Sequence, residues 1–371
     1  LYAMAEHLAL EFREFGLEAE IRDEAGMDGS TQPLLIARGP EVGSSHVLLL
    51  GHLDTVLPAS TPRFVNGRLE GTGAYDMKGG FAALVGALAA LRDFGESLPG
   101  DFVLIGVPDE EIGGPISARA VREWGRAAHT VLVLEPGAAV EGGETLVTGR
   151  RGLSVWRLDA RGTPAHSGVA YWDGRSAAAA AAEWAAEVQR LSEPNGGPLV
   201  NVGRIVGGDS DFVSDFGEEH RFIGTSERLN VIADRCLVEG ELRFLQPKDR
   251  PRILEQMSRK ADELAAEWQV EFEFDEVERI HPMTPSRQSR ELAEHLIELA
   301  RRQGWHLELE DDRGGVSFPN FLPDPFATAV LDGLGPVGGG MHTRQEYLDL
   351  ESLRRRIGLI AEALIFVRDN R

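Results

Sequence analysis

Three short apolar runs in the first part of the chain end in polar or acidic residues, and a helical segment separates the first two. The runs are HVLLLGHLDTV (46–56), DFVLIGVPDEE (101–111) and TVLVLEPG (130–137), and the helical segment is the alanine- and leucine-rich stretch 77–94. Nearly continuous apolar runs are typical of parallel strands buried on both faces. Strands that alternate with helices predict a doubly wound α/β sheet, in which ligands gather at the carboxyl ends of the strands. The polar residues stand at those ends.

The middle of the chain has a different pattern, and we expect an inserted domain there. Alternating stretches such as GLSVWRLDARG and RCLVEGELRFL are interleaved with two helical stretches, and the largely alternating VEFEFDEVERI follows. This order predicts a small α+β module with one polar sheet face over residues 151–281. The glycine-rich stretch 196–226 within it is typical of a loop, and its second half fits no element.

The last part returns to the first pattern, with a helix over 288–303, a strand FATAVLDG and a closing helix near 350–368. Residues 1–150 and 282–371 are therefore predicted to form one α/β domain that the insertion interrupts.

Composition excludes several classes of function. The net charge of −22 and the pI of about 4.9 argue against a protein that binds nucleic acid by neutralising phosphates. The single cysteine, Cys236, rules out an intrachain disulfide framework and fits a reducing, cytoplasmic compartment. No apolar run is long enough to span a membrane. The chain opens in helical period without an initiator methionine, which predicts a truncated start from which a signal peptide could have been lost.

Histidines and carboxylates stand at the strand ends and in the loops beyond them. His52 and Asp54 lie two residues apart, so both point to one side of an extended chain, where the carboxylate could accept the second ring N–H of a metal-bound imidazole. The stretch GTGAYDMKGG places Asp76 at the N-cap of the alanine-rich helix, where capping alone would explain an aspartate. The other candidates are Glu110, Glu111, Glu135 and His342.

Glu110 and Glu111 are adjacent carboxylates, which repel each other and are costly to desolvate unless a cation compensates them. A solvated turn is the alternative explanation. Two histidines and several carboxylates from separate strand ends suit a pair of divalent cations, zinc first. The chain has only three lysines and no G-x-S-x-G elbow, so water is the expected nucleophile.

A dinucleotide site at GTG before the helix is a competing hypothesis. The stretch reads G-x-G-x-x-D, however, and FVNGRLE before it is a poor buried strand. A carboxylate at Asp76 would also stand where a phosphate must approach. These features disfavour a nucleotide-binding enzyme.

Taken together, GHLDTV, GTGAYDMKGG, PDEEIGG, LEPG, GTPAHSG and GPVGGGMHTRQEYL resemble the M20 family of zinc peptidases and amidohydrolases, in the family's order and over nearly the whole chain. GHLDTV with GPVGGGMHT is most similar to the glutamate carboxypeptidase branch. The resemblance implies a zinc-exopeptidase-like mixed sheet with an inserted ferredoxin-like lid or dimerisation domain, and a homodimer.

The resemblance also implies two zinc ions per subunit, with Co²⁺ or Mn²⁺ as possible substitutes. One zinc would be held by His52, Asp76 and Glu135, and the other by Asp76, Glu111 and His342. Asp54 would orient His52. Glu110 would be the general base that takes a proton from a metal-bridging water and passes it to the leaving amine.

In the inserted domain, the resemblance assigns substrate contacts to His166, Asn230 and Arg243. The counterpart of His166 reaches an active site, in several members that of the other subunit. On its own, His166 would be an ordinary loop histidine and Arg243 a surface residue of a strand.

The chain departs from the family pattern near the start of the last domain, where GGVSFPNF places Phe318 and Pro319 in the positions of a small acidic pair. Asn320 would keep part of that pair's role. Ala233 stands where proline is usual, and the stretch 209–226 is longer than expected. These departures concern the substrate pocket and leave the metal ligands intact.

The predicted function is hydrolysis of an amide or peptide bond next to a free carboxylate, in the manner of a glutamate carboxypeptidase. The alternatives are an N-acyl amino acid deacylase of the acetylornithine deacetylase or aminoacylase kind, a dipeptidase, and a non-catalytic binding protein with the same fold. A glutamate side chain would need a cation, which Arg150 or Arg151 could supply unless these residues serve as a hinge.

Overall fold

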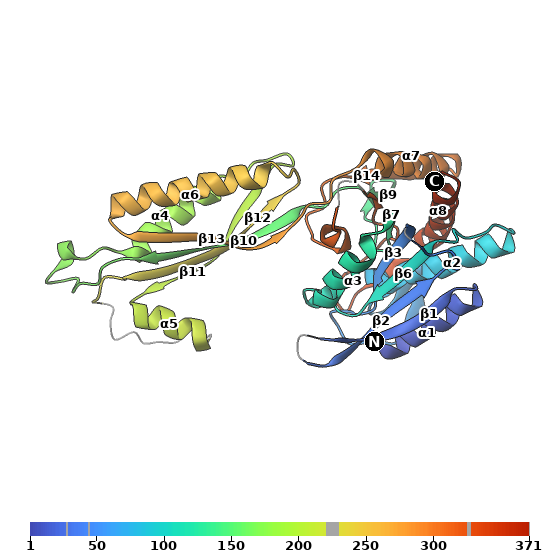
Figure 1. Ribbon diagram of the computed structural model, residues 1–371, viewed down its shortest axis with the longest axis horizontal. Coiled ribbons are helices and arrows are strands. Elements are labelled where there is room, and N and C mark those ends of the chain that lie inside the picture. Colours follow the sequence, from blue (N-terminus) through green and yellow to red (C-terminus); the bar gives the residue numbers. More distant parts are fainter. Residues whose placement is uncertain (27–28, 44, 220–229, 325–327, 371) are drawn as a thin grey trace. The chain divides into compact units, whose positions relative to one another are not determined.

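The computed structural model describes all but a few short stretches of the chain, namely residues 1–26, 29–43, 45–219, 230–324 and 328–370. The chain divides into two compact units: Leu1–Arg150 together with Met283–Arg371, and Arg151–Pro282 (Figure 1). Across the described part, none of the helices combines the length and apolarity needed to cross a bilayer.

The first unit is built on a six-stranded sheet whose centre is parallel. Its strands, in spatial order, are β1 (Glu18–Ala25), β2 (Thr31–Arg38), β6 (Phe102–Val107), β3 (His46–His52), β7 (Ala128–Val133) and β15 (Ala329–Leu331). The last four run parallel, whereas β2 pairs antiparallel with both β1 and β6. The sheet is therefore mixed, and the α/β prediction is confirmed.

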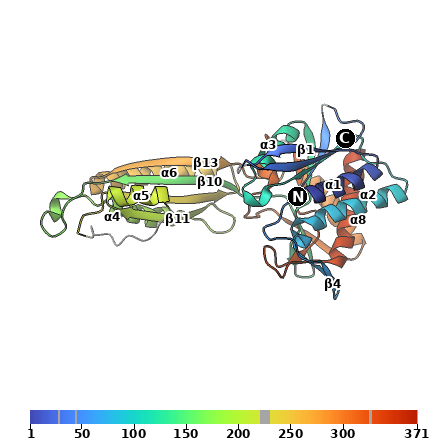
Figure 2. The same ribbon diagram turned by 90° about the horizontal axis from the view of Figure 1, so that it is seen from below.

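Helices cover both faces of this sheet. They are α1 (Tyr2–Glu14), α2 (Gly79–Asp93), α3 (Pro115–Gly125), α7 (Arg287–Arg302) and α8 (Leu350–Asp369). Alternate residues of β3 enter opposite cores. Leu49 packs with α1, α2, α7 and α8, and Leu48 packs with α3 and the 3₁₀ turn η4 (Phe318–Phe321). Figure 2 shows α3 toward the left of this unit and α2 and α8 toward the right. Burial on both faces explains why these strands are apolar throughout.

Two small sheets complete the first unit. One contains β14 (His306–Glu310), β9 (Gly143–Val147) and β8 (Ala139–Val140), and the other contains β16 (Gly338–Gly339), β17 (Tyr347–Asp349), β5 (Arg68–Glu70) and β4 (Arg63–Val65). The second sheet brings the segment after His342 beside the segment that leads to Asp76, because β17 pairs with β5.

The second unit is an antiparallel four-stranded sheet with helices. Its elements, in chain order, are β10 (Gly152–Arg161), η3 (Tyr171–Asp173), α4 (Ala177–Gln189), β11 (Leu199–Gly208), α5 (Ser210–Glu219), β12 (Arg235–Phe244), α6 (Asp249–Trp268) and β13 (Glu271–Ile280). The spatial order β11-β12-β10-β13 and the βαββαβ succession, with α5 added, confirm the ferredoxin-like prediction.

One face of this sheet is apolar and the other is polar. Trp156 of β10 points into the core under α4 and α6, where it meets Trp184 edge to face at 5.5 Å. Its neighbour Arg157 points to the other face and pairs with Glu239. Figure 1 shows α4 and α6 on one side of the sheet and α5 on the other.

The loop prediction for residues 196–226 is wrong over most of its length, because β11 and α5 lie there. The glycines of this stretch are compatible with a strand because β11 pairs with β12 from Leu199 to Gly208, with a register shift at Gly203. Residues 220–226, which end both this stretch and the segment 209–226 that is longer than expected, lie outside the described residues.

Candidate metal centre

Asp76 stands at the centre of the candidate site, in the turn η1 (Ala74–Lys78) before α2. Its Oδ1 atom lies 3.1 Å from Nε2 of His52, and its Oδ2 atom lies 3.1 Å from Nε2 of His342. The predicted N-cap role is wrong. The helix α2 is capped at Lys78 without a side-chain hydrogen bond, and the Asp76 carboxylate faces the two imidazoles instead. One carboxylate thus lies between two histidines that are 290 positions apart in the sequence.

The first group of possible metal ligands contains His52, Asp76 and Glu135, all of them buried. His52 is the last residue of β3, and Glu135 follows the neighbouring parallel strand β7. Their nearest ligand atoms, Nε2 and Oε1, are 3.9 Å apart. Ser317 donates a hydrogen bond from Oγ to Oε1 of Glu135 at 3.1 Å and so orients this carboxylate.

The second group contains Asp76, Glu111 and His342. Glu111 lies in the 3₁₀ turn η2 (Glu110–Ile112) after β6, and its Oε2 atom is 3.1 Å from Nε2 of His342. His342 follows Met341, after a run of three glycines, and has a positive φ of 61°, a conformation that is uncommon for a residue with a side chain and recurs at functional sites. Within each group, the possible ligand atoms lie within 4.8 Å of one another.

Asp54 connects the two ends of the site. Its carboxylate lies 3.3 Å from Nδ1 of His52, opposite the ring nitrogen that faces Asp76. It also accepts backbone hydrogen bonds from Glu110 at 3.3 Å and from Glu111 at 2.9 Å. One buried carboxylate therefore orients both an imidazole and the turn that carries the two glutamates.

The buried carboxylates of the site have raised pKa values, which indicates that they lack compensating positive charge. Burial, together with the charges of Glu110 and Asp76, raises the pKa of Glu135 to about 8. Burial and the charge of Asp76 raise the pKa of Glu111 to about 7. Burial alone would lower the pKa of His52, but its carboxylate neighbours outweigh this effect and raise it. Without a cation, these carboxylates are stable only when they bind protons.

The donor set fits a pair of divalent metal ions. Imidazole nitrogens and carboxylate oxygens in groups of three are typical of zinc sites that keep a position open for water or substrate. The two groups share Asp76, whose two oxygens face different histidines. The part of the chain that the structure describes thus brings together all five predicted ligands. Glu110, also partly buried, belongs to neither group, and burial raises its pKa.

The predicted substrate residues lie in the second unit and do not all converge. Asn230 Nδ2 is 3.2 Å from Nε2 of His166, so these two form a pair. Arg243 lies near the end of β12, eight residues beyond its start at Arg235, which corresponds to about 26 Å of strand. Its guanidinium donates to Glu241 at 2.9 Å.

Arg150 and Arg151 are both engaged by other groups. The buried guanidinium of Arg150 pairs with Asp332 and donates to the carbonyl of Gly315 at 3.2 Å. Arg151 donates to the carbonyl of Gly197 at 2.8 Å. The boundary between the two units falls between these arginines.

The departure at GGVSFPNF is a packing feature in the structure. Phe318 is fully buried in the core below α3, with its ring 6.3 Å from that of His52. Asn320 accepts a hydrogen bond from the backbone of Ser317 at 3.0 Å and closes a capping box. The side chain of Phe318 is therefore inside the core, and the effect of this departure on a substrate pocket stays a prediction.

Sequence reasoning missed three residues that contact the site. They are Ser317, which orients Glu135; Glu346, which binds the backbone of the Asp76 turn; and Lys78, whose pKa is lowered by burial although Glu346, Asp54, Asp76 and Glu111 surround it. All three stand inside stretches that were quoted from the sequence, but only a structure pairs them with their partners.

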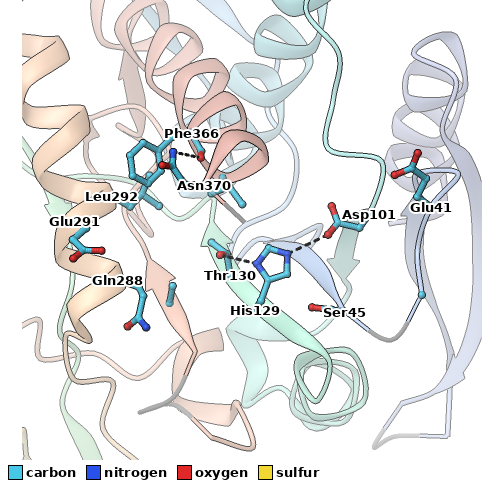
Figure 3. Close-up of a pocket in the computed structure, with 13 residues that line it drawn as sticks. Glu41, Ser45, Asp101, His129, Thr130, Gln288, Glu291, Leu292, Phe366 and Asn370 are labelled. Carbon is cyan, nitrogen blue, oxygen red and sulfur yellow. Dashed lines mark hydrogen bonds and ion pairs between the residues drawn. The ribbon is translucent and has the colours of Figure 1, made fainter.

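A cavity of about 940 Å³ lies elsewhere (Figure 3). Its lining includes Ser45, Asp101 and Ala329, which precede or begin parallel strands, so it lies at the amino ends and the candidate site at the carboxyl ends. Figure 3 shows His129 between Asp101 and Thr130, with both contacts at 3.1 Å. These polar groups satisfy one another.

The mixed α/β sheet and the two ligand groups at its carboxyl edge define a class, the metal-dependent hydrolases of peptide and related amide bonds. The chain matches the description Peptidase family M20/M25/M40 over residues 48–365, which is most of its length, and it belongs to that family. It is therefore a hydrolase that acts on C–N bonds.

Known relatives and solved structures agree with this assignment. The chain is 23% identical to carboxypeptidase G2 of Pseudomonas sp. (strain RS-16), over 87% of this chain and 74% of that protein. It is 27% identical to a succinyl-diaminopimelate desuccinylase of Xylella fastidiosa (strain 9a5c), over 87% and 84%. The structure of aminopeptidase PepT from Bacillus cereus ATCC 10987 has a TM-score of 0.73 at 20% identity, covering 98% of this chain and 92% of that one. A Bacillus subtilis protein described as a dinuclear metal binding peptidase has a TM-score of 0.67 at 17% identity, covering 100% and 93%.

Proposed function

We propose that this protein is a dizinc hydrolase that cleaves an amide or peptide bond next to a free carboxylate, with glutamate carboxypeptidase-like activity. One observation carries the proposal. Two groups of three possible ligands share Asp76, and a partly buried glutamate, Glu110, lies beside them outside both groups. The similarity to carboxypeptidase G2 over most of both chains supports the choice of activity.

When bound, the two metal ions would polarise the scissile carbonyl and lower the pKa of water. The chain supplies the proton transfers. The carboxylate of Glu110 accepts a proton from the attacking water and then passes it to the nitrogen of the leaving amine. Its raised pKa brings it closer to neutral pH, where a carboxylate can both accept and return a proton. Asp54 holds the turn of Glu110 and the ring of His52 in fixed positions during the proton transfer.

His166 and Asn230 would contact the substrate from the second unit. The backbone N–H of Gly168 can only donate, so Nδ1 of His166, at 3.1 Å, must accept. A neutral ring then carries its proton on Nε2, the atom that lies 3.2 Å from the carboxamide of Asn230. That Nε2–H is the donor that we assign to the oxyanion of the substrate. Arg243 would bind the substrate carboxylate through its guanidinium fork.

Removal of a succinyl or other acyl group from an amino acid is the second candidate activity. The desuccinylase of Xylella fastidiosa matches a larger share of its own length than carboxypeptidase G2 does, at a higher identity. A panel of Xaa-Glu dipeptides and N-acyl amino acids, assayed with added zinc, separates the two activities. The homodimer implied by the family resemblance remains a prediction, which analytical ultracentrifugation would test by measuring the mass of the protein in solution.

The substitution Glu110→Gln tests the mechanism. It removes the proton acceptor but neither group of ligands, so we expect turnover on the best substrate to fall at least about 100-fold while the zinc content stays near two per chain. The matched control is Glu308→Gln, a half-exposed residue of β14. Zinc is counted by elemental analysis after gel filtration. Normal turnover by Glu110→Gln would refute the role of Glu110, and less than one zinc per wild-type chain would refute the metal centre.

A further inference from the structure

Glu346 is a buried glutamate directly before β17, and both its carboxylate oxygens bind backbone N–H groups of one turn. Oε2 accepts from Gly73 at 2.9 Å, and Oε1 accepts from Tyr75 at 3.0 Å and from Asp76 at 2.9 Å. Its backbone carbonyl also accepts from Gly71 at 3.1 Å. The donors lie some 270 residues away in the sequence, so this is a long-range tie between two loops.

The turn that Glu346 binds is shaped to receive an anion. Successive backbone N–H groups that point to one side form a concave anion-binding nest, and a carboxylate there makes charge-assisted hydrogen bonds. Gly73 has a φ of 74°, and a Cβ there would meet Nζ of Lys78 at 2.2 Å and a methyl of Thr55 at 2.7 Å. Only glycine fits. The conformation of this turn and the carboxylate of Glu346 therefore depend on each other.

Glu346 also belongs to the loop that carries His342, four residues earlier. That loop is closed by hydrogen bonds from Thr343 to the carbonyl of Gly340, at 3.0 Å from the backbone N–H and 2.7 Å from the side-chain hydroxyl. The carboxylate of Glu346 thus connects the loop of His342 with the backbone of Asp76. These are two of the three possible ligands in the second group.

We propose that Glu346 is a positioning residue that holds Asp76 and His342 at the spacing that the second metal ion requires. This inference rests on the proposed function, because it assumes that Asp76 bridges two ions. Glu346 touches neither ion nor substrate in this scheme. It acts through the backbone of Asp76, whose carboxylate otherwise could rotate with its turn. This role adds a residue to the proposed site and leaves the proposed reaction unchanged.

The conservative variant Glu346→Gln separates charge from shape. A glutamine has the same length but only one acceptor oxygen, so its amide would set an N–H against the N–H of Gly73 or those of Tyr75 and Asp76. Groups that orient metal ligands typically change metal affinity 10- to 100-fold when they are altered. We expect a loss of about that size at one of the two zinc sites, with the other site less affected.

The test measures zinc affinity by competition with a chelator, zinc content after dialysis, and the visible spectrum of the cobalt-substituted protein. Glu346→Gln should bind about one zinc where the wild type binds two, and its cobalt bands should shift, because they report ligand geometry. Saturating zinc should restore kcat with KM unchanged. Glu351→Gln on α8, which pairs with Arg354 at the surface, is the matched control and should behave as wild type.

Each outcome decides the inference. Wild-type affinity at both sites and an unchanged cobalt spectrum in folded Glu346→Gln would overturn it. If that variant does not fold, Glu346→Asp, which keeps the charge but is one methylene shorter, should show the same shifts to a smaller degree. Failure of both variants to fold in saturating zinc would overturn it in favour of a purely structural role. If the wild type itself binds no zinc, the proposed function fails rather than this inference alone.

Discussion

Asp54→Asn is the substitution that most directly tests how the site is organised. The carboxylate of Asp54 serves three donors: the backbone N–H groups of Glu110 and Glu111, and Nδ1 of His52. Asparagine has the same shape but only one acceptor oxygen. If its amide nitrogen replaces Oδ2, it faces the N–H of Glu111. If it replaces Oδ1, it faces both Glu110 and His52. Either orientation places donor against donor.

The size of the effect follows from these contacts. A hydrogen bond to a charged group contributes about 1.5–3 kcal/mol, and at least one of them is lost in either orientation of the amide. About 1.4 kcal/mol corresponds to a factor of ten in an equilibrium constant. We therefore expect zinc affinity or kcat to fall roughly 10- to 100-fold, the range typical of groups that orient metal ligands. The backbone carbonyl of Asp54, 3.1 Å from Nδ1 of His52, keeps the imidazole partly oriented and limits the loss.

The assay combines chelator competition for zinc with kcat and KM on the best substrate of the panel. Asp349→Asn is the matched control, because Asp349 also accepts two backbone N–H groups, those of Glu351 and Ser352, at the start of α8. Circular dichroism verifies that both variants fold. Zinc affinity and kcat of Asp54→Asn within threefold of the control would refute the reasoning.

Two further outcomes are expected. Arg356 is fully buried and donates to Glu144 at 2.9 Å and to the carbonyls of Gly333 and Thr145. Arg356→Met breaks this buried ion pair, leaves Glu144 with Arg355 and Ser352, and should cost about 3–5 kcal/mol. This corresponds to a melting temperature lower by about 6–20 °C in calorimetry, whereas exposed Arg354→Met should melt as wild type, and equal melting would contradict the argument. Secondly, zinc binding to metal-free protein should release roughly three protons at pH 6 and fewer at pH 9. Glu111 and Glu135 have pKa values raised to about 7 and 8, the pKa of His52 is also raised, and all three bind metal only when deprotonated. Calorimetry in buffers of different ionisation enthalpy measures this release, and a release that does not depend on pH would refute it.

The sequence allowed the parallel strands and the ligands at their ends to be predicted together, because both follow from local pattern. His52 ends an apolar run, and the runs must lie side by side if each is buried on both faces. The same local reasoning failed at Asp76. A polar residue before a helix normally caps it, and nothing near it in the sequence shows that two distant histidines reach its carboxylate.

Contacts between distant segments account for the other misses. Ser317 lies in a stretch that departs from the family pattern, and its hydrogen bond to Glu135 spans 182 residues. The prediction that His166, Asn230 and Arg243 serve one substrate depended on the family resemblance. The structure pairs the first two and places the third near the other end of a ten-residue strand. Periodicity gives the face of a strand on which a side chain lies, but not its neighbours across the fold.

The local geometry of the turn after β6 explains how two adjacent glutamates can take different roles. Glu110 and Glu111 are the first residues of a 3₁₀ turn, in which successive side chains diverge by about 120°. If Glu111 points to His342, Glu110 must point elsewhere, and the Asp54 carboxylate holds both of their N–H groups so that the turn cannot rotate. A strand in this place would also separate the two side chains, but its successive N–H groups would point to opposite sides and could not both reach one carboxylate. The helical start of a turn leaves both N–H groups free for Asp54. This turn would thereby let Glu111 bind metal and leave Glu110 available for proton transfer.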